Sequence, residues 1–252
     1  MRIIEFMYLV GYLTERCIIR FKIILKSILL PTPSENPPEF KFIRKLTKTP
    51  LTIHELLSLR LQIMFLLYLL VNLGALLLTN NPLYIIGLGI LYLLYIRHDI
   101  TQYKEFFIEV SPYRVFYYSI FAISFGAFLG YIVLKQIATS VYYYYGYLVI
   151  VFAVVMAFRW YFKQKYGRDY TYGVVEEIKG DVVKVFVHDD IAANVKPGHY
   201  WVDAVEDLEI GRVVKLIVED RKLKGAVPTR IIEVYLTDQS SQSSTEPKEE
   251  TE

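Results

Sequence analysis

The sequence predicts an α-helical polytopic membrane protein, with about four transmembrane helices and a C-terminal small all-β barrel of the OB or SH3-like type. Two observations predict this fold class. Residues 61–162 contain four long apolar runs, and none of these runs includes a charged residue before Arg159, which is typical of membrane-spanning helices. Residues 170–236 then alternate apolar and polar side chains between turn signals, which is typical of short strands.

The four apolar runs are expected to cross the membrane in order. They comprise Leu61–Leu78, Pro82–Ile96, Val115–Leu134 and Val141–Phe162. The second run is short, because its residues reach only about 22 Å as a helix, against about 30 Å for a bilayer core. Residues 61–96 therefore form either two spans or a re-entrant hairpin, and either arrangement returns the chain to the side from which it entered.

Three sites predict where helices begin. Thr52 and Glu55 have the spacing of a capping box, so the first helix is expected to begin before its apolar run. Asn81-Pro82 and Ser111-Pro112 each place a capping residue before a proline at the first helical position.

Five short strands are expected in the soluble part of the chain. They comprise Tyr172–Ile178, Val182–His188, His199–Val205, Arg212–Asp220 and Val227–Leu236. Because no long helix intervenes, the strands predict a small barrel, and a two-sheet sandwich is the alternative.

The remaining segments flank a transmembrane domain at 51–165 and a barrel domain at 166–236. The charged side chains of residues 1–30 fall within an arc of about 160° on a helical wheel. They predict an amphipathic helix that lies on the membrane surface, or that packs against a soluble domain or a partner. Residues 31–50 read as a Pro-rich and basic linker, and residues 237–252 as a disordered acidic tail.

Charge is divided unequally along the chain. Residues 1–165 contain 17 Lys and Arg against 8 Asp and Glu, whereas residues 166–252 contain 11 against 18. The acidic soluble half argues against nucleic acid as a ligand, because phosphate binding requires a basic surface. Twelve basic residues flank the spans on one side, against Lys135 alone on the other. The positive-inside rule therefore predicts a multi-pass protein of the cell membrane, with both termini in the cytoplasm.

Candidate chemistry is sparse, and the sequence predicts no catalytic residue and no cofactor. His54-Glu55 resembles the start of an HExxH zinc motif, but Ser58 stands where the second histidine would be. His98-Asp99 is expected at the membrane interface as a surface pair.

One cluster is a candidate metal site. His188, Asp189 and Asp190 follow or end a predicted strand, and their side chains are suitable ligands for a divalent cation. A turn at the rim of the barrel explains the same three residues equally well.

Small residues recur along the third apolar run. Ala122, Gly126 and Gly130 stand at every fourth position, and the last two form a literal GxxxG. Such a ribbon lets two helices approach closely. It is expected to pack within the four-helix bundle, and the alternative is an interface with a partner or with a second copy in a homo-oligomer.

Two families resemble this chain. The region from YGRDYTYGVVEEIKGDVVKVFV to PGHYWVDAVEDLEIGRVVKLIVED resembles an uncharacterised archaeal family of predicted membrane proteins, known only as a domain of unknown function. The stretch WVDAVEDLEIGRVVKLIVED also looks like the barrel of NfeD-like proteins, in which membrane spans precede an OB barrel that works with stomatin-type scaffolds. This chain departs from NfeD-like proteins in its N-terminal helix, its Pro-rich linker and the loop His188–Gly198. Neither resemblance assigns catalytic positions.

The sequence favours a non-enzymatic, membrane-anchored adaptor or scaffold, whose cytoplasmic barrel binds a protein partner while the helices contact the lipid bilayer. A folded acidic barrel beside spans that lack ionisable groups at depth motivates this hypothesis. The alternatives are a small transporter or channel component, with a path past Asn72 or Ser124, and a membrane enzyme with a metal at residues 188–190.

Overall fold

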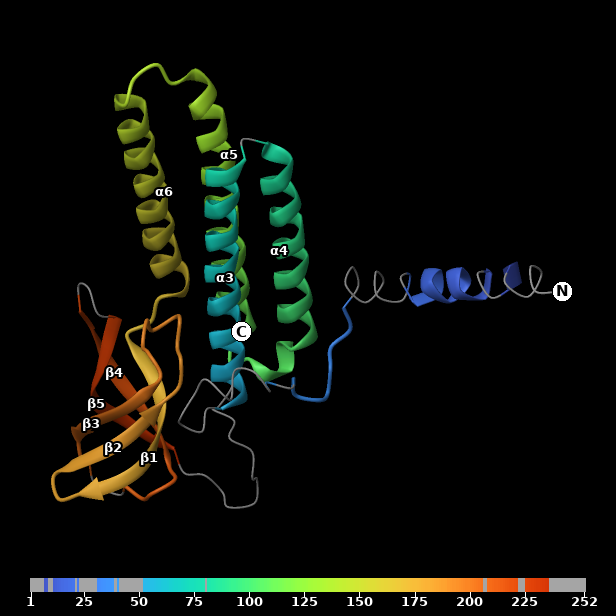
Figure 1. The fold of residues 1–252 in the computed structure, drawn as a ribbon. Coiled ribbons are helices and arrows are strands. Elements are labelled where there is room, and N and C mark those ends of the chain that lie inside the picture. Colours follow the sequence, from blue (N-terminus) through green and yellow to red (C-terminus); the bar gives the residue numbers. More distant parts are fainter. Residues whose placement is uncertain are drawn as a thin grey trace.

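The computed structural model describes residues 7–8, 11–20, 22, 31–38, 40, 52–79, 81–205, 208–221 and 225–235. In this part of the chain, long helices form a bundle and a five-stranded barrel lies at one end of it (Figure 1). The predicted acidic tail at 237–252 and residues 41–50 of the predicted linker lie outside the described residues.

Four long helices follow the four apolar runs. They are α3 (Ile53–Leu78), α4 (Pro82–Gln102), α5 (Val110–Ile137) and α6 (Tyr142–Tyr166), and the short 3-10 helix η1 (Lys104–Phe106) follows α4. All four are long and apolar enough to cross a membrane. Helix α4 continues beyond its apolar run to a length of 21 residues, which is about 31 Å and sufficient for a bilayer core of about 30 Å.

Two of the three predicted helix starts are confirmed. The Thr52 side chain accepts from the Glu55 amide while the Glu55 side chain accepts from the Thr52 amide, which completes the capping box. The Asn81 side chain accepts from the amide of Leu83, with a proline in the first turn. The third prediction is wrong, because α5 begins at Val110 and places Pro112 inside its first turn. A proline is tolerated there, since the amides of a first turn have no partner within the helix.

The bundle has its core in the half next to the barrel. Its buried apolar side chains include Leu56, Leu57, Leu61, Tyr68, Tyr92, Ile96, Ile100, Tyr113, Tyr117 and Phe121. At its centre Tyr68 of α3 stacks on Tyr92 of α4 with ring centroids 4.4 Å apart. Helix α6 packs against α5 through Phe116, Phe158 and Phe162, and most of its apolar side chains are exposed, as expected of a surface that faces lipid.

The predicted small-residue ribbon of α5 is divided between two environments. A side chain at Gly130 would meet the Tyr147 hydroxyl of α6 at 3.2 Å, whereas one at Gly126 would have no neighbour within 4 Å. Ala122 is exposed as well. Of the three residues, Gly130 alone lies against another helix, and a role for the ribbon in assembly stays a prediction.

The soluble part is a closed barrel with strand order β1-β2-β3-β5-β4. The strands are β1 (Tyr170–Lys179), β2 (Val182–Val187), β3 (Gly198–Asp203), β4 (Val213–Arg221) and β5 (Gly225–Tyr235). Strand β3 pairs in parallel with β5, and β4 returns to β1. Closure confirms the predicted barrel over the sandwich, and the order is consistent with an OB-type Greek key. Valines from alternate positions, including Val183, Val185 and Val187, fill the interior.

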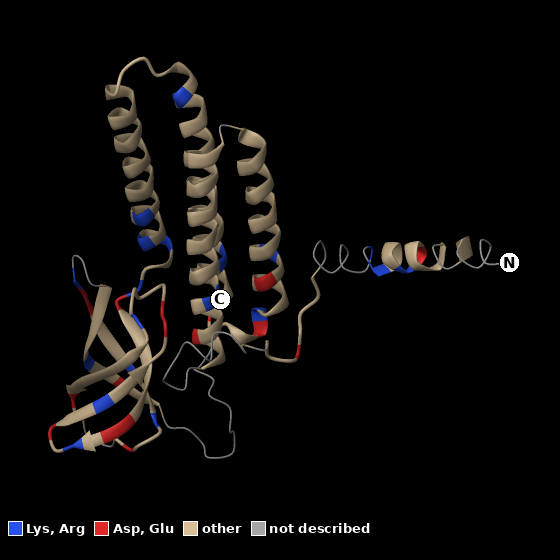
Figure 2. Ribbon diagram, viewed as in Figure 1, with Lys and Arg blue, Asp and Glu red and all other residues tan. Residues whose placement is uncertain are grey.

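Basic residues gather at the barrel end of the bundle (Figure 2). In the described residues, the helix ends and connections near the barrel hold Arg60, Arg97, Lys104, Arg114, Arg159, Lys163, Lys165 and Arg168, whereas the α5–α6 end holds Lys135. The predicted asymmetry of charge therefore coincides with the position of the barrel.

The N-terminal part of the chain reaches the same end of the bundle. Residues 11–20 are helical and exposed, and they lie across the direction of the bundle rather than along it (Figure 1). The extended segment that follows is fixed to the bundle, because the Ser34 amide donates to the carbonyl of Gln102 at 2.8 Å. Phe40 is buried in the helix core.

Candidate functional site

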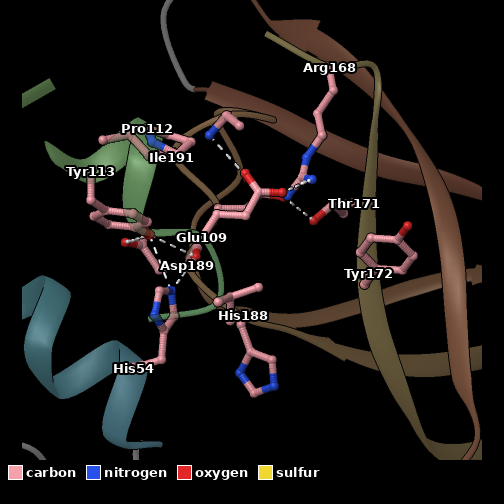
Figure 3. Close-up of a pocket in the computed structure, with 13 residues that line it drawn as sticks. His54, Glu109, Pro112, Tyr113, Arg168, Thr171, Tyr172, His188, Asp189 and Ile191 are labelled. Atoms are coloured by element: carbon pink, nitrogen blue, oxygen red, sulfur yellow. Dashed lines mark hydrogen bonds and ion pairs between the residues drawn. The ribbon is translucent and has the colours of Figure 1, made fainter. Parts of the chain in front are cut away.

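The turn that follows β2 joins the barrel to the helices. Residues 188–192 lie against the first turns of α3 and α5 (Figure 3). Polar side chains from both parts are buried at this junction, including His54, Glu55 and Ser58 of α3. A buried polar group is costly unless it is hydrogen-bonded, so the partners of each group define what the junction does.

Asp189 connects the turn after β2 to both α3 and α5. Its carboxylate accepts from the hydroxyls of Ser58 and Tyr113, the latter at 3.1 Å. Its backbone carbonyl accepts from Tyr113 and from His54 Nε2, each at 3.0 Å. Because a carbonyl oxygen can only accept, His54 carries a hydrogen on Nε2. One residue that follows β2 thus accepts hydrogen bonds from three side chains of two helices.

Glu55 connects the same turn to the start of α3. One of its carboxylate oxygens accepts from the Thr52 amide and closes the capping box, at 2.9 Å. The other lies 3.4 Å from Nδ1 of His188. The carboxylate is almost fully buried, so the group that begins the first helix is also a contact with the barrel.

Arg168, in the segment between α6 and β1, forms a second contact between the helices and the barrel. Its guanidinium bridges Glu109, at 2.6 Å, and Asp190, at 3.0 Å. Burial by itself would lower the pKa of Arg168, but the two carboxylates outweigh it and raise the pKa above its ordinary value. The side chain therefore stays charged, and it ties the start of α5 to the barrel.

Asp190 gives the turn its shape. One carboxylate oxygen accepts from the amides of Ala192 and Ala193, at 3.0 and 2.9 Å. The other accepts from the Thr171 hydroxyl at 2.8 Å, in addition to Arg168. Asp190 and Val195 also exchange both backbone hydrogen bonds. The conformation that presents Asp189 to the helices is thus fixed from within the barrel.

A small cavity remains at the centre of the junction. It has a volume of about 20 Å³ and is lined by His54, Tyr113, Arg168, His188 and neighbouring residues. That is room for about one water molecule and too little for an organic substrate. Ser58 donates to the Asp189 carboxylate rather than to a histidine, so it does not form the serine–histidine pair of a typical nucleophilic serine. The arrangement is suited to holding two domains together.

The three predicted metal ligands lie together in the turn, but their side chains point to different partners. His188 faces Glu55, Asp189 faces Ser58 and Tyr113, and Asp190 faces Arg168. In the described part of the chain, no group of three or more His, Cys, Asp and Glu side chains is arranged to hold a metal ion. Metal binding at these positions stays a prediction.

Sequence reasoning missed the residues on the helix side of the junction. His54 and Ser58 are four residues apart and so share one face of a helix. Two polar side chains on one face at the start of a span indicate a common partner. Tyr113 and Arg168 carry no comparable signal.

The expected surface pair His98-Asp99 is also corrected by the structure. Asp99 is fully buried, and its carboxylate lies 3.1 Å from the guanidinium of Arg60. Arg60 belongs to α3 and Asp99 to α4, so the partner of this carboxylate comes from another helix and not from a surface pair with the neighbouring histidine.

Comparison with known proteins identifies a family but no individual relative. Neither the curated proteins nor the solved structures contain a significant match to this chain. The resemblance to NfeD-like proteins and the archaeal origin therefore stay predictions. A family described as predicted membrane protein (DUF2101) matches residues 25–232, which include all four membrane helices and almost the whole barrel. The chain belongs to this family of predicted membrane proteins.

Proposed function

We propose that this protein is a non-enzymatic, membrane-anchored adaptor that holds its barrel at the cytoplasmic face of the cell membrane, where the barrel binds a protein partner. The observation that carries the proposal is the junction. The barrel is fixed to α3 and to the start of α5 by polar contacts through Asp189, Glu55 and Arg168, so it has a defined position relative to the membrane helices.

The distribution of charge supports the cytoplasmic side. The barrel lies at the end of the bundle where Lys and Arg gather (Figure 2), and short loops rich in these residues stay in the cytoplasm. The described part of the chain contains four candidate spans, and four crossings would return the chain to the side on which it began, so we expect both termini on the cytoplasmic side.

The outer face of β2 and β3 is the surface that suits a partner. Trp201 is 49% exposed there, and the ammonium of Lys179 lies 5.3 Å from the centre of its ring. Val182 adds a second exposed apolar side chain. Exposed tryptophans at the centre of a polar rim are typical of the residues that dominate protein interfaces, and in OB-type barrels the β2–β3 face is a common ligand surface.

The rim of this face is charged with both signs. Glu176 pairs with Lys184 at 3.3 Å and with His199 at 2.8 Å. Together with the net acidic charge of the soluble half, this mixture favours a protein surface over the phosphates of a nucleic acid.

Affinity purification from native membranes in a mild detergent tests the proposal. The co-purifying proteins are identified by mass spectrometry, and the mass of the particle gives the stoichiometry. We expect a stoichiometric partner with the intact chain, and its loss on deletion of residues 170–236 and in Trp201→Ala.

The matched control is Ile210→Ala, which removes an exposed apolar side chain from the β3–β4 connection. It is expected to retain the partner. A partner that survives both the deletion and Trp201→Ala would contradict a role for the barrel, and a particle that contains no second protein would contradict the adaptor itself.

A further inference from the structure

Helices α3 and α4 leave a groove between them on the lipid-facing side of the bundle. It has a volume of about 200 Å³, and its walls are apolar almost throughout. Met64, Leu67 and Val71 line it from α3, and Leu88 and Leu91 line it from α4. Three of these side chains are strongly exposed (Leu67, Val71 and Leu91), so the groove is open along the side of the bundle.

The groove has the depth of one leaflet. Its lining on α3 extends from Met64 to Asn72, which corresponds to about 12 Å along a helix. Half of a bilayer core is about 15 Å. The groove begins one helical turn beyond Arg60, at the barrel end of the bundle, and therefore follows the hydrocarbon of the leaflet on that side.

Arg60 lies at the mouth of the groove. Its Nε donates to the Tyr95 hydroxyl at 3.1 Å, and Tyr95 itself lines the groove. A second guanidinium nitrogen lies 3.1 Å from the carboxylate of Asp99, while 29% of the Arg60 side chain stays exposed. A guanidinium has five N–H donors in a fixed fork, so donors remain beyond these two contacts. The negative charge of Asp99 offsets the positive charge of Arg60. A ligand at the mouth of the groove would therefore be recognised mainly through hydrogen bonds from the guanidinium.

We propose that this groove binds one phospholipid of the barrel-side leaflet, with an acyl chain between α3 and α4 and the phosphodiester on Arg60. An apolar groove of leaflet depth suits a hydrocarbon chain, and a partly exposed arginine at its headgroup end suits a phosphate, because the guanidinium fork matches phosphate geometry. A helix of a second copy would fill the groove but would bring no phosphate to its mouth.

Native mass spectrometry of the purified full chain tests the site. The probes are dioleoylphosphatidylglycerol and dioleoylglycerol, which share their chains and differ in the phosphoglycerol headgroup. We expect the unmodified protein to retain one dioleoylphosphatidylglycerol and to bind dioleoylglycerol at least tenfold more weakly.

Two kinds of variant separate the parts of the site. Val71→Phe, and independently Leu91→Trp, fill the groove and are expected to weaken phosphatidylglycerol binding at least tenfold. The double variant Arg60→Gln with Asp99→Asn removes the guanidinium without leaving a buried carboxylate unpaired, and is expected to bind both probes equally weakly. Val133→Phe, on an exposed position of α5, is the control and is expected to bind like the unmodified protein.

Three results would overturn the proposal. The first is that the unmodified protein retains no more lipid than both groove-filling variants. The second is equal affinity for the two probes, which would remove the phosphate from the site. The third is a dimeric particle that dissociates in Val71→Phe, which would make a second copy the occupant of the groove. Circular dichroism and gel filtration of each variant confirm that it is folded before binding is compared.

Discussion

The barrel has two surfaces of opposite character. The surface around residues 188–192 is polar, largely buried and bonded to α3 and to the start of α5. The outer face of β2 and β3 is exposed and carries Trp201. The first surface specifies where the barrel stands and the second is available to another molecule. The difference teaches that buried polar groups in this chain orient the barrel, whereas the proposed function assigns recognition to an apolar side chain that the fold leaves exposed. Four variants test that division.

Arg168→Ala is expected to have the largest effect on docking. It leaves Asp190, whose side chain is only 10% exposed, without its cation, and the loss of one member of a buried ion pair costs roughly 3 kcal/mol. Thermal unfolding in detergent and hydrogen exchange of residues 188–195 should both show the loss. Arg114→Ala, at an exposed arginine of α5, is the control. An unchanged exchange rate in Arg168→Ala would show that this ion pair does not hold the junction.

Asp189→Ala is expected to be the next most damaging change. Without the carboxylate, the buried hydroxyl of Ser58 loses its acceptor, which costs about 1–3 kcal/mol, whereas Tyr113 retains the backbone carbonyl of residue 189. The barrel should stay folded while exchange in residues 188–195 accelerates. Asp181→Ala, in the exposed turn between β1 and β2, should leave exchange there unchanged. Protection that survives Asp189→Ala would argue that apolar packing alone docks the barrel.

Tyr113→Phe is expected to have a smaller effect of the same kind. It removes one hydroxyl that donates to Asp189 and lies 3.2 Å from His54 Nε2, but it keeps the ring in its packed position. A loss of about 1 kcal/mol is expected. The comparison with Tyr118→Phe, at the half-buried tyrosine further along α5, isolates the hydroxyl. If the two variants were equally stable, the hydroxyl would be irrelevant to docking.

Trp201→Ala is expected to have the smallest effect on stability, within about 0.5 kcal/mol, because the side chain is exposed. It is also the variant expected to abolish partner binding. A large loss of stability would mean that Trp201 supports the barrel, and the distinction between the two surfaces would then fail. The unfolding temperature and the amount of co-purified partner, measured on the same preparation, decide between these outcomes.

Much of the fold is local in sequence and was predictable for that reason. Four apolar runs gave four helices, and the spacing of Thr52 and Glu55 marked the first turn of α3. Alternating side chains located all five strands, since their period of two differs from that of a helix. The helix ends were less accurate. Helix α4 continues beyond its apolar run through Arg97 and Asp99. This extension includes the contact of Asp99 with Arg60 of α3, which the pattern of apolar residues does not predict.

The junction was not predictable, because it joins residues far apart in the chain. His54 and Asp189 are separated by 135 positions. In the sequence, His54 reads as part of an incomplete HExxH motif and Asp189 reads as part of a turn. The buried pair of Arg60 and Asp99 has the same character. Single-sequence patterns report periodicity and turns, whereas the pairing of polar groups is decided by topology.

The double contact of Glu55 has a consequence for how the molecule opens. Its carboxylate both completes the cap of α3 and faces His188 of the barrel. Withdrawal of the barrel therefore removes a neighbour from the group that restrains the first turn of that helix, and fraying of the turn displaces a contact of the barrel. Release of the barrel and fraying of the start of α3 are therefore expected to occur together, as one cooperative unit. The helical structure of the first turn of α3 would then depend on whether the barrel is docked.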